Sequence, residues 1–274
     1  MELRIVNPKQ RYSRARLIEP STSGFIYLAA SVHPRTLFPI VLPSVERSKL
    51  LAKLGDLSLG VQQLDQVIRV HVFRAIFMPP TVRFSAYLKQ RKGSFHIADF
   101  DVMVLIETTS VAAAREVQKA PEYVLLLEAM RKQTRAMHVM ATRNVRRIGG
   151  VDTTRQGLFL FNHFAADDPA VMLDLWEYLA DWYAKETGLS NSVVLAPLEG
   201  ESSDYAIVNW ARWDESPPAH FWHQLSKKTF WNYVTPNLDA NHAASMPIYC
   251  RLVGPGLFLV RVPGPEQVRA GASP

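Results

Sequence analysis

The stretch that decides the fold is 157–164, GLFLFNHF, together with the helix that follows it at 168–187. Aromatic and apolar residues fill the first run, as is typical of a buried strand. Asp168 followed by Pro169 is a strong helix start, because Asp caps free backbone N–H groups and proline fits the first helical position. Gly188 stands where helices commonly end in the left-handed conformation. A strand at 158–164 followed by an amphipathic helix is therefore predicted.

The same kinds of strand and helix signal predict three more strands and a second helix in this half. The strands are expected at 190–196, 205–213 and 248–253, and the helix begins at Pro217-Pro218 and restarts near Lys228. The first half repeats the order β-α-β-β-α-β. Its strands are expected at 24–31, 67–77, 99–108 and 137–148, and its helices at 44–54, ending at Gly55, and from Ser110 through 130 with a break at Pro121.

Two split βαβ units in one chain predict an α+β protein made of tandem ferredoxin-like halves. Their four-stranded sheets are expected to pack face to face and to bury a cavity between them. The predicted parts are a basic, extended or disordered arm at 1–20, a first half at 21–150, a second half at 151–262 and a tail at 263–274. The linker is placed at 149–156.

Composition favours an intracellular globular protein. Hydrophobic residues make up 48% of the 274 residues, Cys250 is the one cysteine, and no apolar run approaches the length of a membrane span. Residues 1–21 lack the apolar region of a secretory signal. We therefore expect a cytoplasmic location.

Charge divides the chain unevenly. Residues 1–150 hold 23 Lys and Arg against 11 Asp and Glu, whereas 151–274 hold 8 against 14. Either the basic half meets an anionic partner or the two halves attract each other, and we favour the second interpretation. The run KQRKG at 89–93 has no accompanying nucleic-acid motif, so nucleic acid is not an expected partner.

The second half resembles a specific family. Its marks are Asn162 in the first strand, Trp213 at the end of the third strand before Asp-Glu-Ser, and a broken helix that restarts at Phe230-Trp231. Together these resemble the antibiotic-biosynthesis monooxygenase (ABM) family of dimeric α+β barrels, over roughly 100 residues of the 274. The first half matches in element order and in the phrase APEYVLLLEAM at 120–130. The resemblance implies a single-chain pseudo-dimer of the barrel.

The resemblance implies several activities. Some ABM members insert oxygen into phenolic polyketides without metal or flavin, and related members bind and degrade haem. The haem degraders carry an axial His four residues after the Phe of the broken helix, and that position here is Val234. We therefore expect no cofactor, with haem as the lesser alternative.

Polar residues on the second-half strands are the first site candidates. Neighbours in a strand point to opposite faces, so only one of Asn162 and His163 can face the cavity, and the resemblance places Asn162 there. A buried amide can orient a carbonyl or stabilise an oxyanion, or it can be bonded within the sheet. Asn209 and Trp213 share a face and suit a flat aromatic ligand, although Trp213 can equally be core.

Histidine and arginine residues complete the candidates. His220 and His223 lie at helical spacing i, i+3, but without a third ligand they are weak evidence for a metal site, and none is expected. His163 or His223 is the candidate base. His71 and Arg74 lie on opposite faces of one strand; they are candidate substrate contacts, although we favour an outward Arg74.

The sequence thus predicts an enzyme, a cofactor-independent oxygenase acting on an aromatic or polyketide-like molecule. Its candidate catalytic residues are Asn162, His163 and His223. The alternative is a non-catalytic binding protein for haem or an apolar metabolite, and a further alternative is a partner-binding role. A small-molecule ligand and a homo-oligomer are the expected partners, and no membrane is expected.

Overall fold

The computed structural model describes residues 1–253 apart from 10–11, 33–35, 38, 81–82, 84 and 92. Arg11, the predicted tail at 263–274 and the last residues of the predicted second half lie outside the described residues. None of the helices in the described part has the length and apolarity that a membrane span requires.

The first half contains the predicted β-α-β-β-α-β order with small additions. Its sheet runs β6-β1-β5-β4, and all neighbours are antiparallel. The elements are β1 (Gly24–Ser31), β2 (Thr36–Leu37), β3 (Ile40–Val41), α1 (Val45–Gln62), β4 (Val67–Phe77), α2 (Ala86–Gln90), β5 (Val102–Thr108), α3 (Val111–Val117), α4 (Pro121–Arg131) and β6 (Ala136–Gly149).

The second half repeats this plan with the sheet order β10-β7-β9-β8. The restart predicted in its last helix is a short π-helix, η2, which begins at Phe230. The elements are β7 (Leu158–Ala166), α5 (Pro169–Thr187), β8 (Ser192–Pro197), β9 (Ile207–Trp213), α6 (Pro217–Leu225), η2 (Phe230–Val234), α7 (Thr235–Ala240) and β10 (Ala243–Leu252). Asp168 caps α5, and Gly188 ends it with φ 67°, as the sequence predicts.

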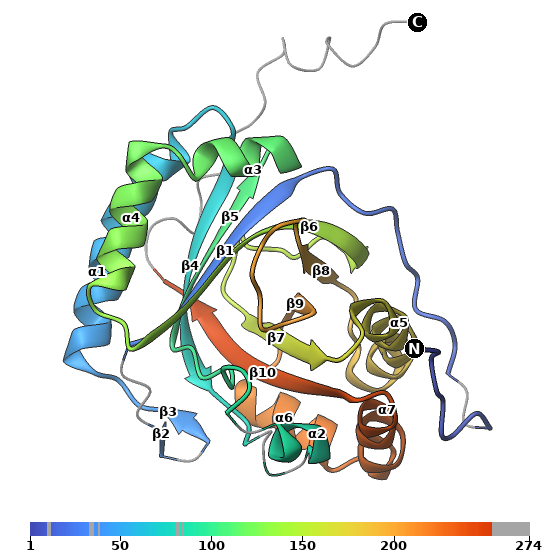
Figure 1. The fold of residues 1–274 in the computed structure, drawn as a ribbon. Coiled ribbons are helices and arrows are strands. Elements are labelled where there is room, and N and C mark those ends of the chain that lie inside the picture. The colour runs from blue at the N-terminus through green and yellow to red at the C-terminus, as the bar shows by residue number, and fades with distance from the viewer. Residues whose placement is uncertain are drawn as a thin grey trace, which may run out of the picture.

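Two strand pairings between the halves close the sheets into one barrel. β6 pairs with β8, and β10 pairs with β4, so the eight long strands form a continuous antiparallel ring (Figure 1). Each half contributes its second and fourth strands to these two seams. The fold is thus a single-chain dimeric α+β barrel with tandem ferredoxin-like halves, which confirms the predicted fold class.

Aromatic side chains fill the interior of the barrel. Phe161 stacks on Trp210 with ring centroids 6.3 Å apart, and Tyr27 stacks on Phe161 at 5.1 Å. All three residues are at most 3% exposed. The helices cover the outside of the ring, with α1 and α4 side by side over the first-half sheet (Figure 1). The expectation of a cavity between the two sheets is therefore wrong, because packed rings occupy that space.

Helix α1 is longer than the sequence predicts. Ser44 caps its N-terminus as expected, but the helix passes through Gly55 and ends at Gln62. Beyond Gly55, Ser58 and Val61 continue the buried stripe against the sheet. Packing of this extended buried stripe outweighs the propensity cost of two glycines, Gly55 and Gly60, about 1 kcal/mol each.

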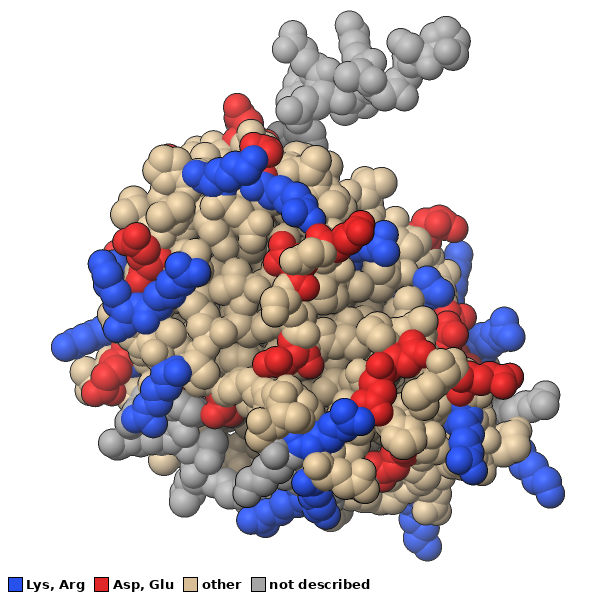
Figure 2. Space-filling model, viewed as in Figure 1, with Lys and Arg blue, Asp and Glu red and all other residues tan. Residues whose placement is uncertain are grey.

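The N-terminal arm is extended and packs against the second half. The backbone N–H of Arg4 donates to Asn241 at 2.8 Å, and that of Ala15 donates to Asp181 at 2.7 Å. The halves also meet through ion pairs such as Arg91–Asp167 at 2.7 Å. On the face in Figure 2, basic and acidic side chains lie among one another. These contacts support the interpretation that the oppositely charged halves attract each other.

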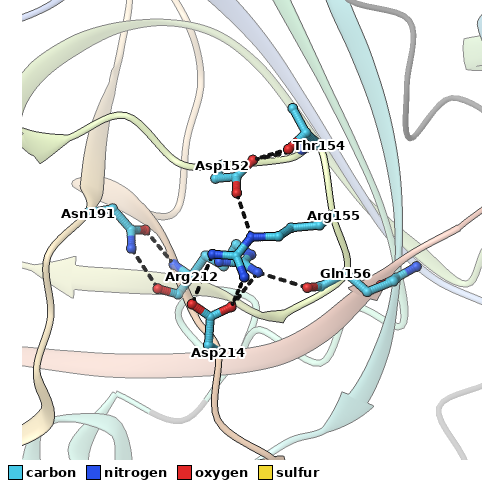
Figure 3. A network of polar contacts seen from close by, with 7 residues as sticks. All are labelled: Asp152, Thr154, Arg155, Gln156, Asn191, Arg212 and Asp214. Carbon is cyan, nitrogen blue, oxygen red and sulfur yellow. Dashed lines mark hydrogen bonds and ion pairs between the residues drawn. The ribbon is translucent and has the colours of Figure 1, made fainter.

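Arg212 ties the linker to the end of the second-half sheet (Figure 3). The residue is buried, and its guanidinium donates to Gln156 O at 2.8 Å and to Asp214 at 2.7 Å. Arg155 joins Asp214 to Asp152, with its Nε donating to Asp152 at 2.9 Å. The network fixes the chain where it passes from one half to the other.

This network predicts a loss of stability in acid. Hydrogen bonds from Thr154 and then from Arg155 lower the pKa of Asp152 to about 2. Because the folded-state pKa lies below the unfolded value of about 3.9, the stabilisation is present above pH about 4 and is lost as the pH falls towards about 2. Urea unfolding should therefore show Asp152→Asn to be less stable than the native chain near neutral pH. The difference should shrink towards pH about 2, and a difference independent of pH would contradict this.

Candidate functional site

An apolar cavity lies outside the barrel, against the second-half sheet. It has a volume of about 210 Å³ and sits between the outer face of the β7, β9 and β10 strands and the helical segment α6–η2–α7. A smaller space of about 30 Å³ adjoins it on the side of α5. The residues that border both spaces are Leu160, Asn162, Tyr183, Trp213, Leu238 and Ser245.

The alternation along β7 places Asn162 in this cavity wall. Phe159 and Phe161 belong to the barrel core, so Leu160 and Asn162 point to the helices. Asn162 lies opposite Asn209 on β9 and Pro247 on β10. Within the described residues its Oδ1 is buried and has no hydrogen-bond partner. Such an atom is costly in an apolar wall, so a ligand that bonds it would recover free energy.

Trp213 and Asn209 continue this wall on β9. Trp213 is 6% exposed, and its Nε1–H has no hydrogen-bond partner among the described residues. Asn209 borders the smaller space, and its Oδ1 already accepts a hydrogen bond from the Ser192 hydroxyl. Both of these predicted contacts therefore share the cavity face with Asn162, but only Trp213 and Asn162 carry polar atoms left without partners.

Helix α6 adds a buried histidine opposite the strands. The His220 ring lies 4.4 Å from that of Trp213, and His220 is 1% exposed. Its Nδ1 lies 3.4 Å from a carboxylate oxygen of Glu215. Burial lowers the pKa of His220, and the Glu215 carboxylate opposes that shift. The neutral imidazole is thus the favoured form at neutral pH.

A chain of polar side chains completes the wall. The Tyr249 hydroxyl donates to Gln224 Oε1 at 3.1 Å, and Gln224 Nε2 donates to the Tyr183 hydroxyl at 3.3 Å. Burial raises the pKa of both tyrosines, so both hydroxyls stay protonated. These groups can hold a polar edge of a ligand, while the surrounding surface is apolar.

Two predicted catalytic histidines lie elsewhere. His163 points into the barrel, where its Nε2 is 2.9 Å from the Tyr27 hydroxyl and burial lowers its pKa to about 3. His223 lies on the outer side of α6 with 54% of its side chain exposed, and it does not line the cavity. The structure therefore contradicts both as cavity bases, because strand alternation and helix rotation turn them away.

The two candidates on β4 are also distant from this cavity. His71 is buried inside the barrel beside Phe73, with ring centroids 6.1 Å apart, and burial lowers its pKa to about 3. Arg74 is exposed on the outer face, as favoured from the sequence, and it does not line the cavity. Neither is a contact for a ligand bound there.

Sequence reasoning missed the positions of several lining residues. The sequence indicates His220 only as one of two histidines with weak metal-ligand spacing. The described residues bring together no group of three ligands suited to a metal ion. The spacing of His220 and Gln224 at i, i+4 is the signal that places both on one face of α6. Tyr183 and Tyr249 carry no such signal, because each is one aromatic in a long apolar pattern.

Comparison with known proteins supports the fold. No family model matches the sequence, and no curated protein matches it. An anthrone oxidase-like protein has a similar structure, with 11% identity, a TM-score of 0.57, and coverage of 89% of this chain and 94% of that one. A candidate monooxygenase from Fusobacterium nucleatum has 8% identity, a TM-score of 0.48 and coverage of 84% and 91%. A haem-binding protein from Thermus thermophilus has 10% identity, a TM-score of 0.44 and coverage of 95% and 99%. At 11% identity the likeness to the anthrone oxidase-like protein shows the fold alone.

The described residues do not fit a haem held as the resemblance implies. Val234, at the position of the axial ligand, is 2% exposed and has no ligating atom. The cavity volume of about 210 Å³ is also below the range of about 300–1,000 Å³ usual for drug-sized ligands.

Proposed function

We propose that this chain is a cavity enzyme of the cofactor-independent monooxygenase type, acting on a flat aromatic molecule that carries hydroxyl or carbonyl groups. The observation that carries the proposal is the apolar cavity in whose wall Asn162 Oδ1 and Trp213 Nε1 are buried, with no partner among the described residues. A ligand that combines an apolar face with a polar edge satisfies both features.

The cavity supplies orientation and a dry environment. The Asn162 carboxamide offers both a carbonyl acceptor and N–H donors, and the Trp213 indole N–H is a donor only. A substrate hydroxyl bonded to the Asn162 carbonyl, with a ring oxygen near Trp213, would be held in one orientation. Donors placed where negative charge develops stabilise an enolate or phenolate, which is the electron-rich form that reacts with O₂.

The reaction proposed is the oxidation of an activated ring CH₂ to a carbonyl. One O₂ is consumed, one oxygen atom becomes the carbonyl oxygen, and the other leaves as water with the two hydrogens of the CH₂ group. The substrate supplies the electrons, so no other reductant is needed. The ABM resemblance and the site together favour this class of reaction over a metal- or flavin-dependent one.

Oxidation of dithranol, a dihydroxylated anthrone, tests this proposal. The native protein should consume O₂ and form the corresponding quinone faster than buffer alone. Binding of dithranol without turnover would instead favour the non-catalytic binding protein, and neither binding nor turnover would overturn the proposed site for this substrate class.

Filling the cavity provides a matched test of its position. Ser245 borders both spaces, so Ser245→Phe should place a ring in the cavity and abolish most binding of dithranol. Thr109→Phe adds the same ring at an exposed position of the first half and should leave binding unchanged. Fluorescence titration of the six tryptophans, two of which (Trp213 and Trp231) line the cavity, measures both. Equal binding by the two variants would contradict the assigned cavity.

A further inference from the structure

Glu215 lies between a buried histidine and an exposed one. Its Oε2 is 3.4 Å from Nδ1 of His220, and its Oε1 is 3.3 Å from Nδ1 of His223. The exposed fractions of the three side chains are 1% for His220, 35% for Glu215 and 54% for His223. The three groups therefore form a line of ionisable side chains that starts at the cavity wall and ends in solvent.

We propose that His220, Glu215 and His223 form a proton relay from the cavity to solvent, in which His220 is the base that receives the substrate proton. This inference rests on the proposed function, because it supplies the proton acceptor that the oxidation requires. It replaces the two histidines that the sequence suggested as bases, of which one is in the barrel core and the other is outside the cavity.

The surroundings of His220 suit this role. Its Nδ1 lies at ion-pair distance from Glu215, 3.4 Å, and neither Nδ1 nor Nε2 makes a hydrogen bond among the described residues. Trp213 of β9 and Tyr249 of β10 pack against the ring, with centroids at 4.4 and 5.5 Å. If this contact tightens so that the carboxylate accepts from Nδ1, it fixes the tautomer in which Nε2 is free to take a proton.

The groups that control the charge of His220 come from three directions. Glu215, in the turn before α6, favours the imidazolium form, and His223 on α6 disfavours it. On the strand side, Tyr249 is neutral because burial raises its pKa. Among the described residues, Glu215 is therefore the anionic group that acts on His220, and it is shared with His223.

The transfer balances without an added reagent. The substrate O–H or C–H bond breaks, its proton bonds to Nε2 of His220, and its electron pair stays on the substrate as the enolate or phenolate. The Nδ1 proton of the resulting imidazolium passes to Glu215, which restores neutral His220. Glu215 then gives this proton to Nδ1 of His223, which releases a proton to water. Distances of 3.3–3.4 Å suit an unloaded site, since such contacts commonly tighten when substrate binds.

NMR titration of the histidine rings tests, without any substrate, whether the Glu215 carboxylate acts on His220. Replacing Glu215 by Gln removes the carboxylate that both histidines face. The apparent pKa of His220 should therefore fall in Glu215→Gln. A matched control, Glu199→Gln, removes an exposed carboxylate outside this group and should leave that pKa unchanged. A His220 titration that is the same in Glu215→Gln and in the native protein overturns the relay.

Turnover of dithranol tests the transfer itself. His220→Gln should lower kcat by about 100-fold, a typical contribution of a general base, with thermal melting showing that the variant is folded. His223→Gln should be slowed several-fold in dilute buffer and recover in concentrated imidazole buffer, which replaces the lost exit group. His242→Asn, at another exposed histidine, should show no such buffer dependence.

The outcomes separate the two proposals. If the native protein does not oxidise dithranol, the proposed function fails for this substrate class, whatever the titrations show. If the native protein turns over and folded His220→Gln is as fast, the relay is overturned and the proposed function stands. If His223→Gln is slow but does not respond to buffer, the exit step assigned to His223 is overturned.

Discussion

Replacing Asn162 by Ala is expected to lower kcat/KM for dithranol oxidation by about 10-fold, because it removes the carbonyl acceptor that bonds the substrate hydroxyl. The side chain is 6% exposed in the cavity wall, and its Oδ1 has no partner within the described residues. Removing it takes away the acceptor that would bond the substrate hydroxyl and orient the ring. Steady-state oxygen consumption measures the loss.

Asn209 provides the matched control for this variant. It lies directly across the β7–β9 pairing from Asn162, but its amide oxygen accepts from Ser192. Asn209→Ala should therefore affect stability more than turnover. Because the Asn162 amide oxygen makes no hydrogen bond in the described structure, Asn162→Ala should keep the native melting temperature. Unchanged turnover in a folded Asn162→Ala protein would remove this residue from the site.

Replacing Asp101 by Ala is expected to destabilise the protein by about 3–5 kcal/mol, the cost typical of breaking a buried ion pair by removing one partner. Asp101 and Arg47 are 0% and 3% exposed, with 4.0 Å between their charged groups. Asp101 also accepts a hydrogen bond from the Val32 backbone N–H at 2.7 Å. The substitution leaves a buried guanidinium, which joins α1 to the first-half sheet, without its carboxylate. Urea unfolding measures the loss.

Two further variants separate charge from hydrogen bonding. Asp101→Asn keeps an acceptor for Val32 but removes the charge, so it should be less harmful than Asp101→Ala. Combining it with Arg47→Met removes both charges, and the double variant should be more stable than the sum of the single losses predicts. Strictly additive losses would show that the two charged groups do not interact.

Local patterns were sufficient to predict most elements. Ser44, Ser110 and Asp168 each cap the helix predicted for them, since a side-chain oxygen that accepts from backbone N–H groups is a local interaction. The exception is Gly55, which the sequence suggested as a helix end. There the contacts that extend α1 come from the sheet and from α4, and these are distant along the chain.

The candidate site was predicted only in part, for a geometrical reason. Alternation along β7 shows that Asn162 and His163 face opposite ways, but both faces of this strand are buried: all of its residues except the last are buried. One face meets the barrel core and the other meets helices, so neither face has the polar pattern that would mark it as outer. From the resemblance to ABM proteins, Asn162 is expected to face a cavity between the sheets and His163 to face the helices; both expectations are wrong, because Asn162 faces the helices and His163 faces the barrel interior.

The order of elements, their caps and the sets of residues that share a face could be predicted from the sequence, because these follow from neighbours within a few positions. Which face lies inside could be seen only in the folded chain. That choice depends on the pairings of β6 with β8 and of β4 with β10, which join residues far apart in the chain. Once these seams close, aromatic rings fill the barrel and the apolar cavity lies under α6, η2 and α7, where His220 rather than His163 reaches its wall.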